Sequence, residues 1–149
     1  MEIKNILVTT DLSETSTKAF EPARVLAEKF GAQLHAVYVE EDRLPPLVVE
    51  YTTVGLEEIL QLQADQAQTR LRKFVDDQWG TDIDVNLAVL TGTAHAEIVR
   101  MAERCHADLI VMATHGRGFI SHAILGSTTE RVVRRAECPV FVIRDTGAN

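Results

Sequence analysis

The chain has 149 residues, of which 46% are hydrophobic, 25% charged and 5% aromatic. A domain of this size folds without disulfides or metal, and this composition excludes a disordered, collagen-like or disulfide-dense protein. The 22 acidic residues outnumber the 15 basic ones, which gives a net charge of −7. This charge argues against a protein that grips nucleic acid through phosphate contacts, but it leaves room for one small anion in a local pocket.

The two cysteines, Cys105 and Cys138, lie far apart in the sequence and outside any CxxC motif. We therefore expect neither a disulfide framework nor a thiol metal site. The first residues contain no long apolar run of the secretory type, and no segment approaches the ~18 apolar residues of a membrane span. These features favour a cytoplasmic protein without membrane insertion.

Short apolar runs alternate with longer segments of helical periodicity. We expect strands at 6–8, 33–39, 83–89, 109–113 and 140–143, and helices at 13–30, 56–78, 94–105 and 127–136. A loop at 41–53 carries an apolar run, Leu47 to Val49, that we expect to cover a pocket or a partner. This alternation predicts one α/β domain with a parallel sheet and right-handed crossovers. The continuous apolar runs at 6–8, 109–113 and 140–143 are typical of strands buried on both faces.

The helix limits and buried faces follow from spacing. Pro22 is expected to kink the first helix or leave the Lys18 carbonyl unpaired, and Gly31 and Gly80 are expected to end the first and second helices. Thr93 and its neighbours should cap the third helix. The predicted buried faces are Ala19, Ala23, Leu26 and Phe30 in the first helix, Leu56, Leu60, Ala64, Ala67, Leu71 and Phe74 in the second, and Ile98, Met101 and Cys105 in the third.

Candidate binding residues follow the strands, because open parallel sheets bind ligands beyond the carboxyl ends of their strands, where strand order reverses. The segments at those ends are Thr9–Asp11, Val39–Glu40 and Thr114–Gly118. Glycines in the last segment let backbone N–H groups approach an anion closely. The following Gly126–Thr129 opens a helix with unpaired N–H groups and three hydroxyls. Together they predict a phosphate site built from two pieces.

Other standard sites find no support. There is no Walker A motif, and the partial GxGxxG pattern from Gly116 follows the fourth strand instead of the first. The five histidines lack the HxH or HExxH spacing of a zinc site. Ser127 lacks a nucleophile elbow, and nothing in the sequence orients His115 as an acid or base. No general base, metal-binding carboxylate cluster or arginine finger accompanies the phosphate loop, so we expect no efficient enzyme.

The run from Ala113 to Gly118, followed by Gly126 and Ser127 with nine residues between Gly116 and Gly126, resembles the nucleotide-binding signature of the universal stress protein family. That signature is a glycine, two residues, a glycine, nine residues, a glycine, and then Ser or Thr. Residues 6–13, 107–112 and 138–143 also resemble the family, and the likeness spans about 1–145, leaving a tail at 146–149. It implies a five-stranded, Rossmann-like sheet of order 3-2-1-4-5, in which the Asp11 and Gly116 loops face each other.

The resemblance to the ATP-binding branch implies a regulatory protein that responds to ATP, with Mg²⁺ as an optional companion and slow hydrolysis at most. The implied binding residues are Thr9, Thr10, Asp11, Val39, Met112, Ala113, Gly116, Arg117, Gly118, Gly126, Ser127, Thr128 and Thr129. The alternatives are a protein that binds cyclic AMP or AMP, and an interaction module that binds no nucleotide.

Several residues keep a simpler alternative role. Asp11 either holds ribose or the adenine edge, or caps the first helix, a role also open to Ser13. The residues from Gly126 to Thr129 either bind phosphate or form a turn and a cap, and Arg117 either pairs with phosphate or is solvated. Ala113 replaces the family's first glycine, which costs about 1 kcal/mol where φ is positive and nothing where the residue continues a strand, as we expect.

The implied strand order leaves the last strand at the edge of the sheet. Its residues Val140, Phe141, Val142 and Ile143 include no lysine, proline or bulge signal. Such an edge favours antiparallel pairing with its own copy about a two-fold axis. Family members commonly dimerise through this strand, so we expect a homodimer, with larger assemblies as a further option. The sequence does not name any other protein partner.

Overall fold

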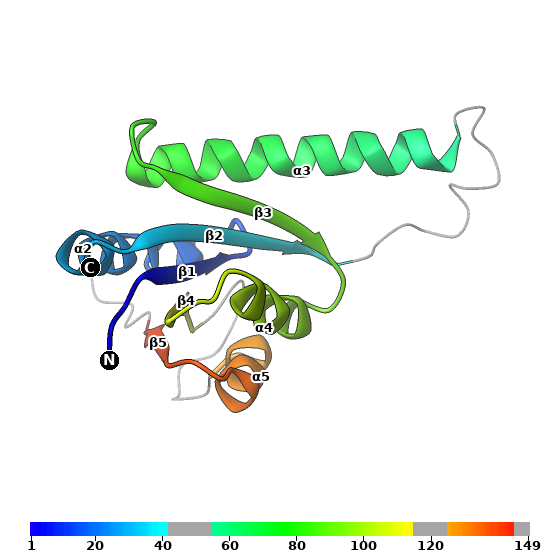
Figure 1. Ribbon diagram of the computed structural model, residues 1–149. Coiled ribbons are helices and arrows are strands. Elements are labelled where there is room, and N and C mark those ends of the chain that lie inside the picture. Colours follow the sequence, from blue (N-terminus) through cyan, green and yellow to red (C-terminus); the bar gives the residue numbers. More distant parts are fainter. Residues whose placement is uncertain (42–54, 115–124, 145–149) are drawn as a thin grey trace.

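The computed structural model describes residues 1–41, 55–114 and 125–144. One parallel sheet has the order β3-β2-β1-β4-β5, which confirms the predicted fold class and strand order. Its strands are β1 (Asn5–Thr10), β2 (Gln33–Glu40), β3 (Val85–Thr91), β4 (Leu109–Ala113) and β5 (Val140–Ile143). The helices are α1 (Glu14–Thr17), α2 (Phe20–Phe30), α3 (Leu56–Trp79), α4 (Ala94–Arg104) and α5 (Ser127–Arg135). Figure 1 shows the strands side by side, with α3 alongside β3 and with α4 next to α5.

Two cores form because side chains alternate between the faces of each strand. On β1, Ile6 and Val8 contribute to the core under α2 and α3, whereas Leu7 contributes to the core under α4 and α5. β1 and β4 are buried on both faces, as predicted. β5 is not, because Phe141 at the sheet edge is 44% exposed and its three neighbours are half-buried.

The predicted first helix is two helices. α1 ends at Thr17, and α2 begins at Phe20. Pro22 lies in the first turn of α2, where a backbone N–H would have no intrahelical partner. The proline therefore marks the start of a helix, and the prediction of one kinked helix is wrong. Gly31 ends α2 in the left-handed region at φ 65°, and Gly80 follows the end of α3, both as predicted.

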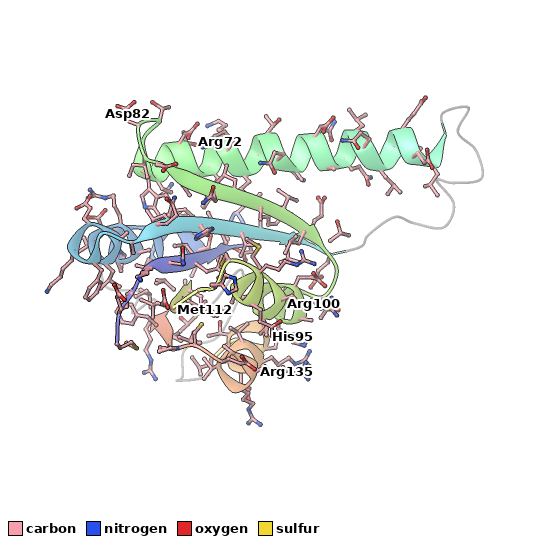
Figure 2. The ribbon with its side chains drawn as sticks, in the orientation of Figure 1. Arg72, Asp82, His95, Arg100, Met112 and Arg135 are labelled. Atoms are coloured by element: carbon pink, nitrogen blue, oxygen red, sulfur yellow. The ribbon has the colours of Figure 1, made fainter. Side chains whose placement is uncertain are left out.

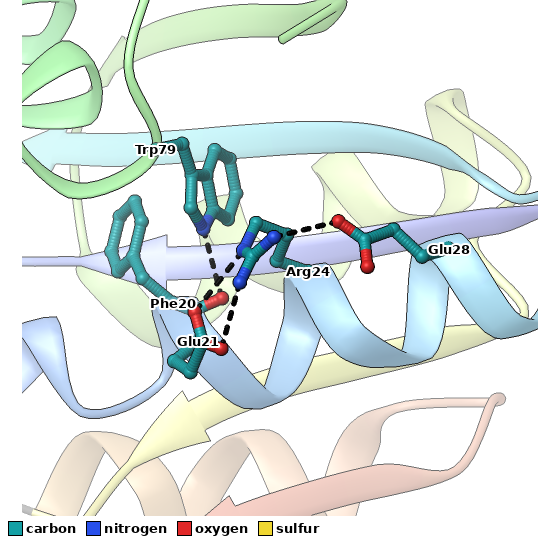
Figure 3. A network of polar contacts seen from close by, with 5 residues as sticks. All are labelled: Phe20, Glu21, Arg24, Glu28 and Trp79. Atoms are coloured by element: carbon teal, nitrogen blue, oxygen red, sulfur yellow. Dashed lines mark hydrogen bonds and ion pairs between the residues drawn. The ribbon is translucent and has the colours of Figure 1, made fainter.

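α2 and α3 are joined by an aromatic cluster (Figure 3). The indole N–H of Trp79 donates to the carbonyl oxygen of Phe20 at 2.9 Å. The Phe20 ring also lies 4.7 Å from the indole and 5.4 Å from the Phe74 ring, between ring centroids. On the outer side of α2, Arg24 pairs with Glu21 and Glu28, an exposed network that contributes little to stability.

α3 is longer than the part of the sheet that it covers. Its buried residues begin in the middle of the helix and continue to its end: Ala67, Leu71, Val75 and Trp79. Leu56 and Leu60 are 45% and 44% exposed, and Ala64 is exposed too, so the buried face predicted for this part of the helix is wrong. Figure 1 shows this N-terminal part extending past the strands.

Smaller differences concern single positions. Phe30, predicted to be inward, is 48% exposed at the end of α2. The third strand begins at Val85, two residues later than predicted, because a turn follows α3. The apolar run from Leu47 to Val49 and the tail 146–149 lie outside the described residues. Within the described ranges, no helix is both long and apolar enough to cross a membrane.

Candidate functional site

A large cavity opens at the carboxyl ends of the strands, where the strand order reverses between β1 and β4. Its volume is about 1550 Å³. Ten of the predicted site residues line it: Thr9, Thr10, Asp11, Val39, Met112, Ala113, Gly126, Ser127, Thr128 and Thr129. The other three, Gly116, Arg117 and Gly118, lie outside the described residues. The topology thus brings together segments far apart in the chain, although ligand binding by them stays a prediction.

Asp11 lies at the end of β1 on the wall of the cavity. One of its carboxylate oxygens, Oδ1, accepts the backbone N–H of Ser13 at 2.9 Å. Ser13 is the N-cap of α1, and its hydroxyl accepts the N–H of Ser16 at 3.3 Å. The capping role therefore belongs to Ser13. The Oδ2 of Asp11 has no hydrogen bond within the described part of the chain, and the side chain is exposed.

Thr10 has a different role from Asp11. Ser16 donates its hydroxyl proton to the carbonyl of Ser13 at 2.7 Å, so the 2.7 Å contact between the two hydroxyls has Thr10 as its donor. The Thr10 oxygen also accepts the backbone N–H of Leu12 at 2.9 Å. Leu12 itself adopts the left-handed region at φ 62°. Thr10 thus shapes the turn that presents Asp11, and its proton is not available to a ligand.

The end of β4 forms the opposite wall. Ala113 pairs in register with Ile143 of β5, and the described residues with positive φ do not include it. The expectation that alanine here continues the strand is confirmed, so its methyl group introduces no backbone strain. The Ala113 carbonyl accepts the Thr129 hydroxyl at 3.3 Å, and the Thr114 carbonyl accepts the Gly126 N–H at 3.1 Å. These two bonds fix the start of α5 against the strand.

The N-terminus of α5 faces the cavity without a side-chain cap. Its N-cap is Gly126, and the first helical bond runs from the Glu130 N–H to the Gly126 carbonyl at 2.9 Å. The N–H groups of Ser127, Thr128 and Thr129 precede that bond and have no acceptor among the described residues. An end of this kind attracts anions through its N–H groups and the helix dipole. Capping by Thr128 or Thr129 is not observed, because the cap position is a glycine.

Other cavity residues come from α3 and α4, which the sequence did not indicate. Arg70 of α3 pairs with Glu40 at the end of β2, with a nitrogen–oxygen distance of 2.8 Å. Ala94 and Ile98 of α4 also line the cavity, and Ile98 belongs to the same core cluster as Met112. No local motif marks these positions, because they reach the cavity through the packing of whole helices. Thr93 occupies the N-cap of α4 as predicted, but its side chain makes no capping bond.

The thiols do not form a reactive site. Cys105 and Cys138 are both free and half-buried, and both pack against the core under α4 and α5. Burial raises the pKa of each thiol, which disfavours the nucleophilic thiolate. Across residues 1–41, 55–114 and 125–144, no three His, Cys, Asp or Glu side chains gather as a metal site would require.

The parallel sheet of order β3-β2-β1-β4-β5, with a cavity where the strand order reverses, defines a doubly wound α/β fold. The universal stress protein family model matches residues 2–144, and the chain belongs to this family. It is 34% identical over 144 residues to the universal stress protein MJ0531 of Methanocaldococcus jannaschii, covering 95% of this chain and 82% of that one. The structure of MJ0577 from the same organism superimposes with a TM-score of 0.75 at 27% identity, over 99% of this chain and 100% of that one.

Two more distant structures of the family contain adenine nucleotides. One universal stress protein is in complex with cyclic AMP, with a TM-score of 0.66 at 20% identity over 97% of this chain and 98% of that one. Another, from Archaeoglobus fulgidus, is in complex with dAMP, with a TM-score of 0.61 at 19% identity over 96% of this chain and 99% of that one. At these identities the likeness shows a shared fold.

Proposed function

We propose that this universal stress protein binds ATP in the cavity and acts as a regulatory protein that responds to the nucleotide. The observation that carries the proposal is the uncapped N-terminus of α5, which shares the cavity with the exposed carboxylate of Asp11. A positive helix end and a carboxylate on one cavity suit a molecule with an anionic chain at one end and hydroxyl groups at the other.

Each part of ATP finds complementary groups. The N–H groups and hydroxyls of Ser127 and Thr128 suit phosphate oxygens, and the free Oδ2 of Asp11 suits ribose hydroxyls. Val39 and Met112 supply apolar wall for the adenine ring. Mg²⁺, when it accompanies ATP, takes most of its ligands from phosphate and water, with hydroxyls such as that of Ser127 as further donors.

Regulation suits the site better than turnover does. The Asp11 carboxylate is held in the turn by the Ser13 N–H, and Glu130, the acidic residue in the first turn of α5, is paired with Arg134 and does not line the cavity. Hydrolysis, where it occurs, is therefore slow. The cytoplasm is the proposed location, since ATP is available there.

Cyclic AMP or AMP is the second candidate, favoured by the two family structures that contain cyclic AMP and dAMP. A monophosphate would use the Asp11 and Val39 side of the cavity and leave part of the α5 N-terminus unused. ATP would use both.

Thermal unfolding with each nucleotide tests the proposal. A ligand that binds only the native state at 100 times its Kd adds about 2.7 kcal/mol of stability. We expect ATP with Mg²⁺ to raise the Tm more than AMP or cyclic AMP does, and Gly126→Ala to reduce the ATP shift by crowding the phosphate path. Gly126 has φ −57°, which alanine also adopts, so the variant should fold. Arg131→Ala on the outer face of α5 is the control and should keep the full shift.

Two results would contradict this assignment. A protein without any Tm shift in millimolar ATP would argue for the interaction module that binds no nucleotide. A larger shift with cyclic AMP than with ATP would replace the proposed ligand. Mass spectrometry of small molecules released from the purified protein gives an independent identification.

We also propose a homodimer through β5, with larger assemblies as an option. β5 is an edge strand, and Phe141 is 44% exposed on the side away from α4 and α5. Antiparallel pairing of two β5 strands would satisfy the unpaired backbone groups of the edge and cover this ring.

A further inference from the structure

The outward face of α5 carries an unusual concentration of positive charge. Its nine residues include Arg131, Arg134 and Arg135, all exposed, in a chain whose net charge is −7. We call these three residues the α5 arginine face. The inward residues of the same helix, Thr129 and Val132, are buried and pack against the rest of the protein.

Most of this charge is not neutralised within the protein. Arg131 has no hydrogen bond or ion pair within the described part of the chain. The guanidinium of Arg135 donates from Nη1 to Nε2 of His95 at 3.1 Å, and burial together with Arg135 and Arg131 lowers the pKa of that histidine. His95 is therefore a neutral acceptor that leaves the charge of Arg135 uncompensated. Figure 2 shows His95 and Arg135 beside each other where α4 meets α5.

The arginines of α2 and α3 provide a contrast. Arg24, Arg70 and Arg72 each lie within ion-pair distance of at least one carboxylate, at 2.7 to 3.8 Å. On α5 only Arg134 has such a partner among the described residues, Glu130 at 2.9 Å. The α5 arginine face is thus a surface where the protein leaves guanidinium groups available to an external anion.

The surface is also hollowed. A depression of about 410 Å³ is lined by Ser127, Glu130, Arg131, Arg134 and Arg135. Ser127 also lines the large cavity, so an occupant of the depression would border the proposed nucleotide site. Guanidinium groups bind carboxylates through paired hydrogen bonds, but a single exposed ion pair is weak, so a stable complex requires several carboxylates at once.

We propose that the α5 arginine face docks an extended acidic segment of a partner protein. Arg131 and Arg135 are one helical turn apart, about 6 Å along the axis. Alternate residues of an extended chain lie on one side about 7 Å apart, so acidic residues at every second position match this spacing. Nucleic acid is disfavoured, because the rest of the surface is acidic and would repel its phosphates.

The test measures binding of a fluorescent peptide to the full-length protein without nucleotide, so its result does not depend on the proposed ATP site. The probe is an extended peptide with glutamate at every second position, and its control has glutamine at those positions. We expect the glutamate peptide to bind at low salt and the glutamine peptide not to bind. Binding of the glutamate peptide should weaken as the salt concentration rises past about 0.1 M. Arg131→Gln/Arg135→Gln should weaken binding by about tenfold or more. Arg131→Gln, which leaves the His95 contact intact, should weaken it by a smaller factor.

Arg24→Gln on α2 is the matched control, since it removes an exposed arginine that already has carboxylate partners. It should bind the peptide like the wild type, and Arg131→Lys should recover part of the affinity lost in Arg131→Gln. The proposal is overturned if the glutamate peptide fails to bind, if the glutamine peptide binds equally, or if the double variant keeps wild-type affinity. Tighter binding of a single-stranded DNA of equal charge would also overturn it.

Discussion

Asp11 shows how one side chain combines structural and ligand-facing roles. Its Oδ1 accepts the Ser13 N–H, while the buried hydroxyls of Thr10 and Ser16 hold the turn beneath it. The turn is therefore arranged before any ligand arrives, which reduces the entropy that binding costs. This arrangement explains why the carboxylate can remain exposed at a fixed position on the cavity wall.

Asp11→Asn should weaken ATP binding by about tenfold, because an amide presents one carbonyl oxygen where the carboxylate presents two charged acceptors. The Oδ1 bond to Ser13 survives in the variant, so its Tm without nucleotide should stay close to that of the wild type. Isothermal titration calorimetry measures the effect. Asp82→Asn is the control, since Asp82 is exposed in the segment that follows the C-terminal end of α3 (Figure 2). Equal affinities for Asp11→Asn and the wild type would remove Asp11 from the site.

His35 predicts a pH dependence of stability. It is buried on β2, with Nε2 3.2 Å from Oδ1 of Asn5, and burial lowers its pKa below the ordinary 6.5. The unfolded chain therefore binds the proton more readily than the native protein does. Stability should be greatest above pH 6.5 and should fall as the pH drops from 6.5 towards the lowered native pKa.

Urea unfolding between pH 7.5 and pH 5.5 measures this dependence. His35→Gln should reduce the change in the free energy of unfolding per pH unit. His106→Asn is the matched control, because His106 is exposed and its φ of 49° suits asparagine. A slope that is unchanged in His35→Gln would show that other groups cause the pH dependence.

At the scale of elements, the position of α3 depends on its C-terminal half. Trp79 both donates to the Phe20 carbonyl and packs on the Phe20 ring, which ties the end of α3 to the start of α2. The N-terminal half of α3 has no comparable contact and leaves Leu56 and Leu60 exposed. The cavity residue Arg70 lies in the C-terminal half, so its position depends on the same contacts.

Trp79→Ala should lower the free energy of unfolding by about 3–5 kcal/mol, the usual cost of removing a large buried aromatic side chain. Val25→Ala is the control, because Val25 is 48% exposed on α2 and should change stability little. Since Trp79 is the protein's single tryptophan, unfolding must be followed by circular dichroism. A loss below about 1 kcal/mol would show that the aromatic cluster does not hold α3 in place.

At the scale of the whole molecule, the sheet is asymmetric at its two edges. β3 at one edge is covered by α3, whereas β5 at the other leaves Phe141 exposed. Val142 of the same strand faces inward and packs against the core under α4 and α5. Phe141 is therefore the position at which an interface can be disrupted without disturbing the core.

Phe141→Lys should convert a wild-type dimer into a monomer, because a lysine at an edge strand blocks pairing with a second chain. Sedimentation velocity at micromolar concentration distinguishes the two states. Phe30→Lys is the control, since Phe30 is similarly exposed, at 48%, on the end of α2, and this variant should remain dimeric. A monomeric wild type, or a Phe141→Lys protein that stays dimeric, would contradict the proposed interface.

The sequence by itself determined the features that depend on local chain chemistry. Periodicity identified the five strands of the described sheet and the helical segments between them, although it joined α1 and α2 into one helix. Glycines marked the ends of α2 and α3, because these signals act within a few residues. The family likeness implied one binding site that includes Asp11 and Gly126–Thr129, and the strand order of the structure brings these residues to one cavity.

Tertiary structure decided what depends on contacts between distant segments. The exposure of Leu56 and Leu60 could not be read from their helical spacing, because spacing does not show how far the sheet extends beneath a helix. Likewise, the pairing of Arg70 with Glu40 and the contact of His95 with Arg135 join residues 30 and 40 positions apart. Whether a polar side chain is occupied or available, as for Thr10 and Asp11, is settled by three-dimensional neighbours that no local pattern specifies.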